Sequence, residues 1–256
     1  MQGVILAGGL GTRLSEETAT MPKPMVEIGG KPIIWHIMKL LGQHDISEFI
    51  ICCGYKGYMI KEYFDNYHRH VDDFTIKLQS GKKTTIKKST EDWNITLIDT
   101  GPETQTGGRL KRIKDHIKGT FLMTYGDGVS DVDVTALKKF HYDSNRQATV
   151  TAVQPPGRFG ALQLEKDTVR SFMEKPAGDS SWINGGFFIL EPETINLISD
   201  DNTAWEDYPL RQLARISQLG AYKHHGFWRP MDTLRDKTVL EEMWGKNEAP
   251  WRTWET

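Results

Sequence analysis

Hydrophobic residues in the first half of the chain alternate between two spacings. Residues 3–7 and 48–54 are short, continuous apolar runs, which are typical of strands covered on both faces of a sheet. Between them, residues 32–41 carry apolar side chains at the spacing of a helix face. A strand, a helix and a strand in this order form a βαβ unit, in which the two strands run parallel.

The same alternation continues toward the middle of the chain. It predicts helices at 57–66, about 108–117 and 134–143, and a further strand at 120–127. We therefore predict an α/β fold with a doubly wound, mostly parallel, Rossmann-like sheet and helices on both faces. In such a sheet, ligands bind beyond the carboxyl ends of the strands.

The second half of the chain is richer in short strands between proline and glycine turns. These strands are predicted at 148–154, 160–165, 169–176, 185–192 and 220–227, and helices at 193–198, 204–217 and 233–245. Earlier, strands at 74–78 and 95–99 flank a polar insertion at 80–94, which indicates a mobile hairpin or loop. Because no repeat or linker interrupts the chain, we predict one domain, residues 1–256, whose β-rich second half continues the same sheet.

The charge of the chain is nearly balanced. There are 32 Lys and Arg against 34 Asp and Glu residues, which argues against a general binder of nucleic acid or membrane surfaces. Cys52 and Cys53 are adjacent in an apolar run, so we expect buried, reduced thiols rather than a disulfide or a zinc site. The N-terminus lacks the pattern of a secretion signal, and no stretch suits a membrane span, which predicts a cytoplasmic protein.

A glycine-rich stretch, VILAGGLGTRL at residues 4–14, includes the first predicted strand and the turn after it. It is not a P-loop, because Arg13 stands where that motif requires its second glycine. Gly9 and Gly11 fit the dinucleotide-binding fingerprint, but Leu14 takes the place of its last glycine and no helix follows promptly. A tight turn without a ligand is the plain alternative, and the position at the expected binding edge of the sheet disfavours it.

The remaining interpretation of this stretch is a loop that binds phosphate. Glycines let backbone N–H groups approach phosphate oxygens closely and form an anion-binding nest. Arg13 adds a forked donor, and Lys23 adds a mobile point charge. Either cation alone is ordinarily a solvated surface group, but the two together behind this loop indicate a polyphosphate ligand.

The motif G-G-x-G-T-R-L, with a lysine ten residues after its arginine, resembles the signature of sugar-phosphate nucleotidylyltransferases. Similar phrases run through nearly the whole chain: MPKPMVEIGGKPI, FIICCGYKG, DTGPETQTGGRLKRI, TYGDGVSD, PPGRFGAL, FMEKP, INGGFF and GFWRPMDTLRDK. The glycine loop is common to the family. The phrases TGGRLKRI, PPGRFGAL and GFWRPMDTLRDK are narrower and resemble the cytidylyl members.

This resemblance implies a reaction between CTP and α-D-glucose 1-phosphate. A sugar-phosphate oxygen would attack the α-phosphorus, giving pyrophosphate and CDP-glucose, a precursor for dideoxysugar synthesis. The resemblance also implies Mg²⁺ as cofactor and a homo-oligomer, and the balanced charge predicts no nucleic-acid or membrane partner. It divides the chain into a nucleotide-binding half at about 1–130 and a sugar-phosphate-binding half at about 131–256.

The resemblance assigns catalytic and metal-binding roles to particular residues. Arg13, Lys23 and Asp127 are the implied catalytic residues, with Arg13 nearer the departing pyrophosphate and Lys23 near the α-phosphate. Asp127 and Asp232 are the implied Mg²⁺ ligands, because Mg²⁺ prefers carboxylate and phosphate oxygens. A turn residue at Asp127 and a helix N-cap at Asp232 are the plain alternatives.

The other implied contacts form two sets. The nucleotide would be held by Leu6, Ala7, Gly8, Gly9, Gly11, Thr12, Arg13, Lys23, Thr106, Gly107, Gly108 and Arg109. The sugar phosphate would be held by Gly160, Glu174, Lys175 and Asn184, with an ordinary surface pair as the alternative for Glu174 and Lys175. We expect an exposed backbone at 106–109 to meet the pyrimidine edge, although these residues do not distinguish cytosine from uracil or thymine.

Three other functions stay open. A uridylyl- or thymidylyltransferase would keep the chemistry with another base. A nucleotide-sugar-dependent glycosyltransferase would bind its metal through Asp131 and Asp133, although acidic residues there favour capping of the next helix. A non-catalytic nucleotide-binding subunit would not need the cations and carboxylates that the chain keeps.

Three segments outside the main motifs have simpler expectations. His224 and His225 lie in a predicted strand without a third metal ligand, so we expect a structural role. The tryptophan-containing tail at 249–256 is expected to pack on the body or on a neighbouring subunit. The insertion at 80–94 is expected to reach a neighbouring active site.

Overall fold

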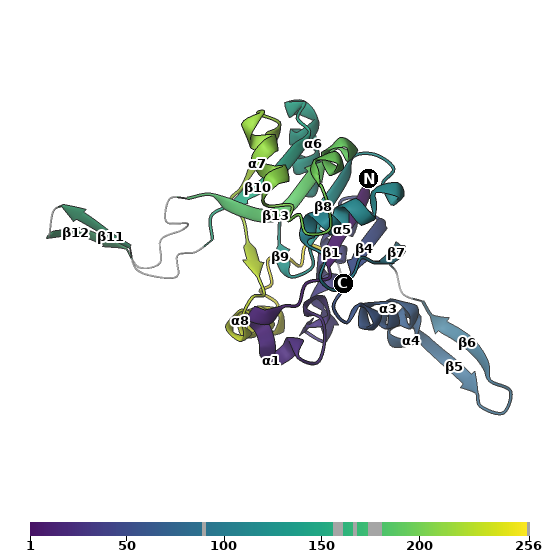
Figure 1. The fold of residues 1–256 in the computed structure, drawn as a ribbon. Helices are drawn as coiled ribbons and strands as arrows, with labels where there is room; N and C mark the ends of the chain where they lie inside the picture. Colours follow the sequence, from purple (N-terminus) through teal and green to yellow (C-terminus); the bar gives the residue numbers. More distant parts are fainter. Residues whose placement is uncertain (89–90, 156–160, 166–167, 174–180, 255–256) are drawn as a thin grey trace.

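The computed structural model describes residues 1–88, 91–155, 161–165, 168–173 and 181–254. Its centre is a seven-stranded sheet in the order β14-β10-β13-β8-β1-β4-β7 (Figure 1). β13 runs antiparallel to both neighbours and the other neighbouring pairs are parallel, which confirms the predicted mostly parallel sheet. The strands are β1 (Gln2–Ala7), β4 (Glu48–Cys53), β7 (Asn94–Asp99), β8 (Phe121–Tyr125), β10 (Ala148–Val153), β13 (Ile183–Leu190) and β14 (Leu219–His224).

Helices cover both faces of the sheet, as predicted. Because side chains alternate along a strand, Ile5 of β1 packs on one face and its neighbours Val4 and Leu6 pack on the other. The first face is covered by α2 (Ile33–Gly42), α3 (Gly57–Asp65), α6 (Val134–Ser144) and α8 (Leu234–Gly245). The second is covered by α5 (Thr106–Arg112), the 3-10 helix η5 (Pro192–Leu197) and α7 (Tyr208–Arg215).

Short elements connect these larger ones. They are η1 (Thr12–Leu14), α1 (Ser15–Thr18), η2 (Lys23–Met25), β2 (Glu27–Ile28), β3 (Lys31–Pro32), α4 (Tyr67–Val71) and η3 (Lys114–His116). The side chain of Asp133 accepts a hydrogen bond from the Ala136 amide at 2.9 Å, which confirms Asp133 as the cap of α6. At α8 the capping box is formed by Thr233 and Asp236, so Asp232 is not the cap of that helix.

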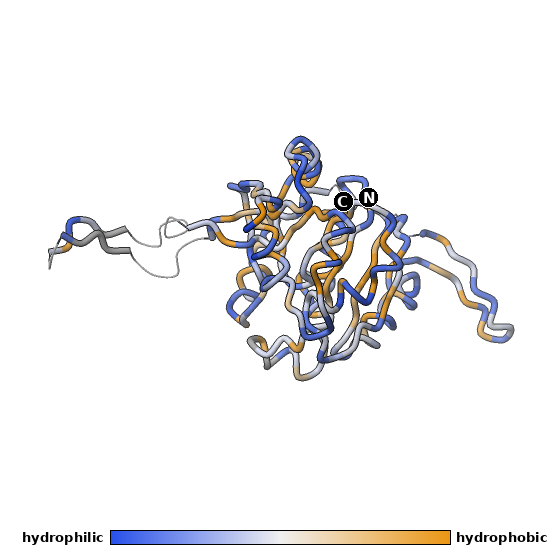
Figure 2. Tube along the Cα trace, turned by 45° about the horizontal axis from the view of Figure 1, so that its top comes forward, coloured by the Kyte–Doolittle hydropathy of each residue, from blue (hydrophilic) through white to orange (hydrophobic). Residues whose placement is uncertain are grey.

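Two pairs of strands stand apart from the central sheet. β5 (Asp73–Lys77) and β6 (Lys82–Lys87) form a hairpin, so the strand predicted at 74–78 pairs with the polar insertion and not with the main sheet. Every residue of this hairpin's strands is exposed, and the hairpin projects from the body (Figure 2). β11 (Ala161–Glu165) and β12 (Thr168–Met173) form a second separate pair, so the prediction that the second half continues the central sheet was wrong for these two strands.

The C-terminal tryptophans pack on the body of the chain. Trp251 is fully buried and Trp254 nearly so, and both rings lie beside His36 of α2. Cys52 and Cys53 are buried in β4 as predicted, and burial raises the pKa of the Cys53 thiol to about 11. Within the described ranges, no helix combines the length and apolar character needed to cross a membrane.

Candidate active site

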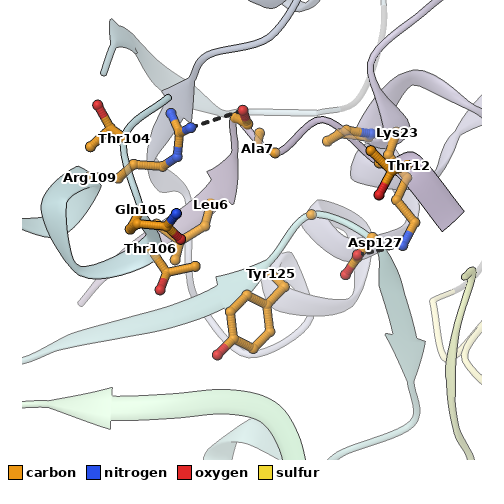
Figure 3. Close-up of a pocket in the computed structure, with 15 residues that line it drawn as sticks. Leu6, Ala7, Thr12, Lys23, Thr104, Gln105, Thr106, Arg109, Tyr125 and Asp127 are labelled. Carbon is orange, nitrogen blue, oxygen red and sulfur yellow. Dashed lines mark hydrogen bonds and ion pairs between the residues drawn. The ribbon is translucent and has the colours of Figure 1, made fainter. Parts of the chain in front are cut away.

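A pocket of about 290 Å³ opens beyond the carboxyl ends of β1 and β8 (Figure 3). This is the edge where a doubly wound sheet is expected to bind its ligands. Most members of the predicted nucleotide set line it, together with Asp127: Leu6, Ala7, Gly8, Gly9, Gly11, Thr12, Lys23, Thr106 and Arg109. Five lining residues were not anticipated from the sequence: Pro24, Thr104, Gln105, Tyr125 and Gly126.

The side chain of Lys23 is buried between two carboxylates. Only 6% of this residue is exposed, and its Nζ lies 2.7 Å from Oδ2 of Asp127 and 2.7 Å from Oδ1 of Asp232. A lysine is rarely buried unless its charge is paired, and charge-assisted hydrogen bonds of this length are strong ones. The structure thus brings together three of the predicted catalytic and metal-binding residues, although Lys23 and Asp232 are 209 positions apart.

A short two-stranded ribbon holds the two aspartates side by side. β9 (Gly128–Ser130) begins directly after Asp127, and its antiparallel partner β15 (Trp228–Pro230) ends two residues before Asp232. The amide of Met231 donates to the carbonyl of Asp127 at 2.8 Å, which extends the pairing up to the site. Backbone pairing between distant segments therefore sets the position of both carboxylates.

His224 supports the far end of this ribbon. Its Nε2 lies 3.1 Å from the carbonyl oxygen of Phe227 and 3.0 Å from Oδ1 of Asp131. Because a carbonyl only accepts, Nε2 carries a hydrogen in this arrangement. The structural role expected for His224 is confirmed. The glycosyltransferase alternative loses support, because Asp131 contacts His224 and Asp133 caps α6.

The donors around Lys23 fit a magnesium ion that also binds substrate phosphate. The oxygens of Asp127 and Asp232 contact the same nitrogen atom, so they lie within reach of a single cation. In the described part of the chain, no group of three or more His, Cys, Asp or Glu side chains could hold a metal by itself. Mg²⁺ is commonly bound by one or two carboxylates and completes its shell with water and phosphate, which matches this pair.

Arg109 lines the pocket, but its guanidinium is bonded to the protein itself. It donates to the carbonyls of Gly8 at 2.9 Å and Gly101 at 2.8 Å, and to Oγ1 of Thr100 at 2.7 Å. Only 3% of Arg109 is exposed. These bonds join the loops that follow β1 and β7, so Arg109 holds the glycine loop in place. Its contact with a nucleotide stays a prediction.

The glycines of the loop have different structural reasons. A Cβ at Gly8 would lie 2.0 Å from Nη1 of Arg109, and Gly11 adopts a φ of +66°. Around Gly9, by contrast, no atom of the described residues lies within 4 Å of the position that a Cβ would take, and Gly9 is exposed at the pocket. Arg13 lies in η1, but its side chain is outside the described part of the structure, and its contact with phosphate stays a prediction.

Gly107 and Gly108 are buried at the start of α5 and do not line the pocket. A Cβ at Gly107 would lie 2.6 Å from the carbonyl oxygen of Thr203, and one at Gly108 would lie 2.5 Å from that of Asp201. The expectation of an exposed backbone was therefore wrong for these two residues. Their small size instead lets α5 pack closely on the segment at 201–205.

Glu206 joins two hydroxyl groups at one end of the pocket. Thr106 Oγ1 donates to its Oε2 at 2.6 Å, and the Tyr125 hydroxyl donates to its Oε1. Asn184, from the predicted sugar-phosphate set, lies beside them, with 3.5 Å between its Nδ2 and the Tyr125 hydroxyl oxygen. No linear motif marks Glu206, because only folding brings it to the pocket. The other members of the predicted sugar-phosphate set lie outside the described residues: Gly160, Glu174 and Lys175.

Known proteins resemble this chain in sequence and in fold. The family described as nucleotidyl transferase matches residues 2–229. The chain is 58% identical to the glucose-1-phosphate cytidylyltransferase of Salmonella typhi, over 100% of both chains. It is 41% identical to the probable glucose-1-phosphate cytidylyltransferase of Bacillus subtilis (strain 168), over 99% of this chain and 100% of that one. The fold matches that of a putative glucose-1-phosphate thymidylyltransferase from Bacillus anthracis with a TM-score of 0.70, at 18% identity, over 100% of this chain and 98% of the other. The chain therefore belongs to the nucleotidyl transferase family.

Proposed function

We propose that this enzyme transfers the cytidylyl group of CTP to α-D-glucose 1-phosphate, giving CDP-glucose and pyrophosphate. The chemistry is that of the nucleotidyl transferase family. The choice of base and sugar is supported by the full-length relatives from Salmonella typhi and Bacillus subtilis, which are named for this reaction. A uridylyl- or thymidylyltransferase differs only in the base and is separated from this proposal by experiment.

The observation that carries the proposal is the buried ammonium group of Lys23 between Asp127 and Asp232. The reaction brings two phosphate anions together, so the site must supply positive charge at the reacting phosphorus. Lys23 supplies a preorganised cation at the carboxyl edge of the sheet. Gly9 is exposed beside it at the pocket, and we assign the backbone N–H groups of the glycine loop to phosphate oxygens.

The protein contributes alignment and charge neutralisation to the reaction. The sugar 1-phosphate is already an anion, so its oxygen attacks the α-phosphorus without a nucleophilic side chain or a strong base. The new P–O bond forms as the bond to the pyrophosphate oxygen breaks. We assign Lys23 to the α-phosphate, and Arg13 with the glycine loop to the departing pyrophosphate.

Asp127 and Asp232 are the residues that would hold Mg²⁺. When bound, the ion neutralises phosphate charge and helps to orient the leaving group. The proposal also includes a sugar-phosphate-binding half at about 131–256 beside a nucleotide-binding half at about 1–130, and a cytoplasmic location. The contacts it assigns to the sugar phosphate are those of Gly160, Glu174, Lys175 and Asn184.

Pyrophosphate release tests the proposal directly. The protein is incubated with glucose 1-phosphate, Mg²⁺ and one nucleotide at a time: CTP, UTP, dTTP, ATP or GTP. We expect release largely confined to CTP. A clear preference for another nucleotide would overturn the base assignment and keep the chemistry, whereas silence with all five nucleotides would contradict the choice of sugar phosphate or the activity itself.

A further inference from the structure

The carboxylate of Glu206 fixes the direction of two hydroxyl hydrogens at one end of the pocket. A carboxylate group only accepts hydrogen bonds, and a hydroxyl group has a single hydrogen to donate. The hydroxyls of Thr106 and Tyr125 each bond a different oxygen of Glu206. Both hydroxyls therefore direct their only hydrogen toward Glu206 and away from any ligand.

These hydroxyls offer a ligand only their lone pairs. Oγ1 of Thr106 already accepts from the Trp205 amide at 2.9 Å, which leaves it one further lone pair. Among the described residues, the one donor to the Tyr125 oxygen is Nδ2 of Asn184, at a long distance of 3.5 Å. Thr106 and Tyr125 both line the pocket (Figure 3). This end of the pocket thus presents acceptors to a substrate.

The arrangement is held in place from both sides. Trp205, directly before Glu206, is fully buried, and its ring packs at 6.1 Å from that of Phe188. The Tyr125 ring also packs edge-on against Phe188, with 6.4 Å between the ring centroids. Phe188 thus packs against both Tyr125 and Trp205, the residue that precedes Glu206.

The position of Tyr125 indicates which part of a substrate meets these acceptors. Tyr125 ends β8 only two residues before Asp127, so it lies next to the place assigned to the reacting phosphates. In the proposed reaction, the ribose and the hexose are the groups attached directly to those phosphates, whereas the base is one unit further away. Sugar hydroxyls are hydrogen-bond donors that both substrates carry, whereas the amino group of cytosine is a donor on the nucleotide alone.

We propose that Glu206 is a positioning residue for substrate recognition. By orienting the hydroxyls of Thr106 and Tyr125, it makes this end of the pocket accept a hydrogen bond from a sugar hydroxyl of the substrate. This inference rests on the proposed function for its substrates. The ribose and the hexose share the required chemistry, and the experiment distinguishes them.

The test compares the wild-type protein with Glu206→Gln. The two hydroxyls contact different oxygens of Glu206, so in the glutamine variant one of them faces the amide nitrogen, which donates and does not accept. KM and kcat are measured for CTP against its 2′-deoxy and 3′-deoxy analogues. They are also measured for glucose 1-phosphate against deoxyfluoro analogues, whose fluorine cannot donate a hydrogen bond.

In the wild type, removing the recognised hydroxyl is expected to raise KM roughly threefold to tenfold, the scale of one net hydrogen bond. In Glu206→Gln, KM for the natural substrate is expected to rise by a similar factor, while kcat changes less. The further rise in KM on removing the hydroxyl from the substrate is expected to become much smaller than in the wild type. The substrate whose analogues show this difference, CTP or glucose 1-phosphate, identifies the ribose or the hexose as the recognised sugar. Tyr125→Phe, which removes one acceptor, is expected to reproduce the result.

Asp207→Asn is the matched control, because Asp207 is the exposed neighbour of Glu206 and pairs with Arg211 at 3.0 Å. The proposal would be overturned if removing a sugar hydroxyl raised KM equally in Glu206→Gln and in the wild type. It would also be overturned if the substitution changed only the preference for CTP over UTP, because the acceptors would then face the base. The same penalties measured as binding affinities by calorimetry do not require turnover. If the wild-type protein binds CTP but releases no pyrophosphate, the proposed function is contradicted. The calorimetric penalties would still show whether Glu206 positions the two hydroxyls.

Discussion

Lys23 competes with a metal ion for the oxygens of two carboxylates. Asp127 and Asp232 carry two negative charges, and the single ammonium of Lys23 contacts both of them. A divalent cation that uses these oxygens must therefore displace a buried, paired charge. A nucleotide phosphate near Lys23 would attract the ammonium and release the oxygens, so we expect the metal and the nucleotide to bind together.

Replacing Lys23 with methionine separates these two effects. We expect Lys23→Met to lower turnover by roughly 10²-fold or more, as for the loss of a preorganised charge contact. We also expect the nucleotide-free variant to bind Mn²⁺, used as a spectroscopic probe, more tightly than the wild type does. Electron paramagnetic resonance titration measures this affinity. Lys39→Met is the control, because Lys39 is also paired with a carboxylate, Glu91 at 3.3 Å, and neither residue lines the pocket. Unchanged or weaker Mn²⁺ binding in Lys23→Met would contradict the competition.

The elements differ in how much their sequence reveals. The spacing of apolar residues was enough to predict β1, α2 and β4, because local periodicity decides which faces are buried. The β9–β15 ribbon was missed, because its pairing joins short segments from distant parts of the chain. For the same reason, the resemblance named Asp127 and Asp232, but neither spacing nor composition shows that they meet at Lys23. The prediction of an exposed backbone at Gly107 and Gly108 was wrong, because the sequence does not distinguish a glycine that allows close packing from one that exposes its backbone.

α2 and the C-terminal segment meet at a histidine whose protonation is expected to affect stability. His36 Nε2 donates to the carbonyl of Ile28 at 2.9 Å, and its Nδ1 accepts from Trp251 Nε1 at 3.3 Å, so both nitrogens are used in the neutral form. Burial lowers the pKa of His36 from 6.5 to about 4. Between these values the unfolded chain binds more protons than the folded one. Stability is therefore fully present above about pH 6.5 and falls as the pH drops toward 4.

The size of this effect can be measured by urea unfolding at about pH 7.5 and pH 5. We expect His36 to contribute a loss of about 2 kcal/mol over this interval, from about 1.4 kcal/mol per pH unit below its unfolded pKa. His36→Gln keeps a donor for Ile28 and does not titrate, so its stability should fall less with pH than that of the wild type. An equal fall in both proteins would assign the pH dependence to other groups.

At the scale of the whole molecule, the β5–β6 hairpin is exposed to solvent in a single copy of the chain. Apolar side chains project along β5–β6 and its turn, with Leu78 85% exposed and Ile86 72% exposed. A two-stranded hairpin is marginally stable by itself in water, and exposed apolar groups of this kind favour a protein contact. Together with the oligomer that the family resemblance implies, this predicts that the hairpin packs against a second copy of the chain and reaches its active site.

A double substitution on the hairpin tests this arrangement. Leu78→Lys with Ile86→Lys places two charges on the apolar surface, so we expect the oligomer to dissociate at a protein concentration where the wild type stays assembled. Light scattering after size-exclusion chromatography measures the mass, and pyrophosphate release measures the activity of each fraction. Ile216→Lys is the matched control, since Ile216 is 45% exposed at the end of α7 and lies far from the hairpin in sequence. If the hairpin completes a neighbouring site, the dissociated variant loses activity along with its mass. A fully active wild-type monomer would contradict the contribution of a second copy, and an intact oligomer in the double variant would move the interface to another surface.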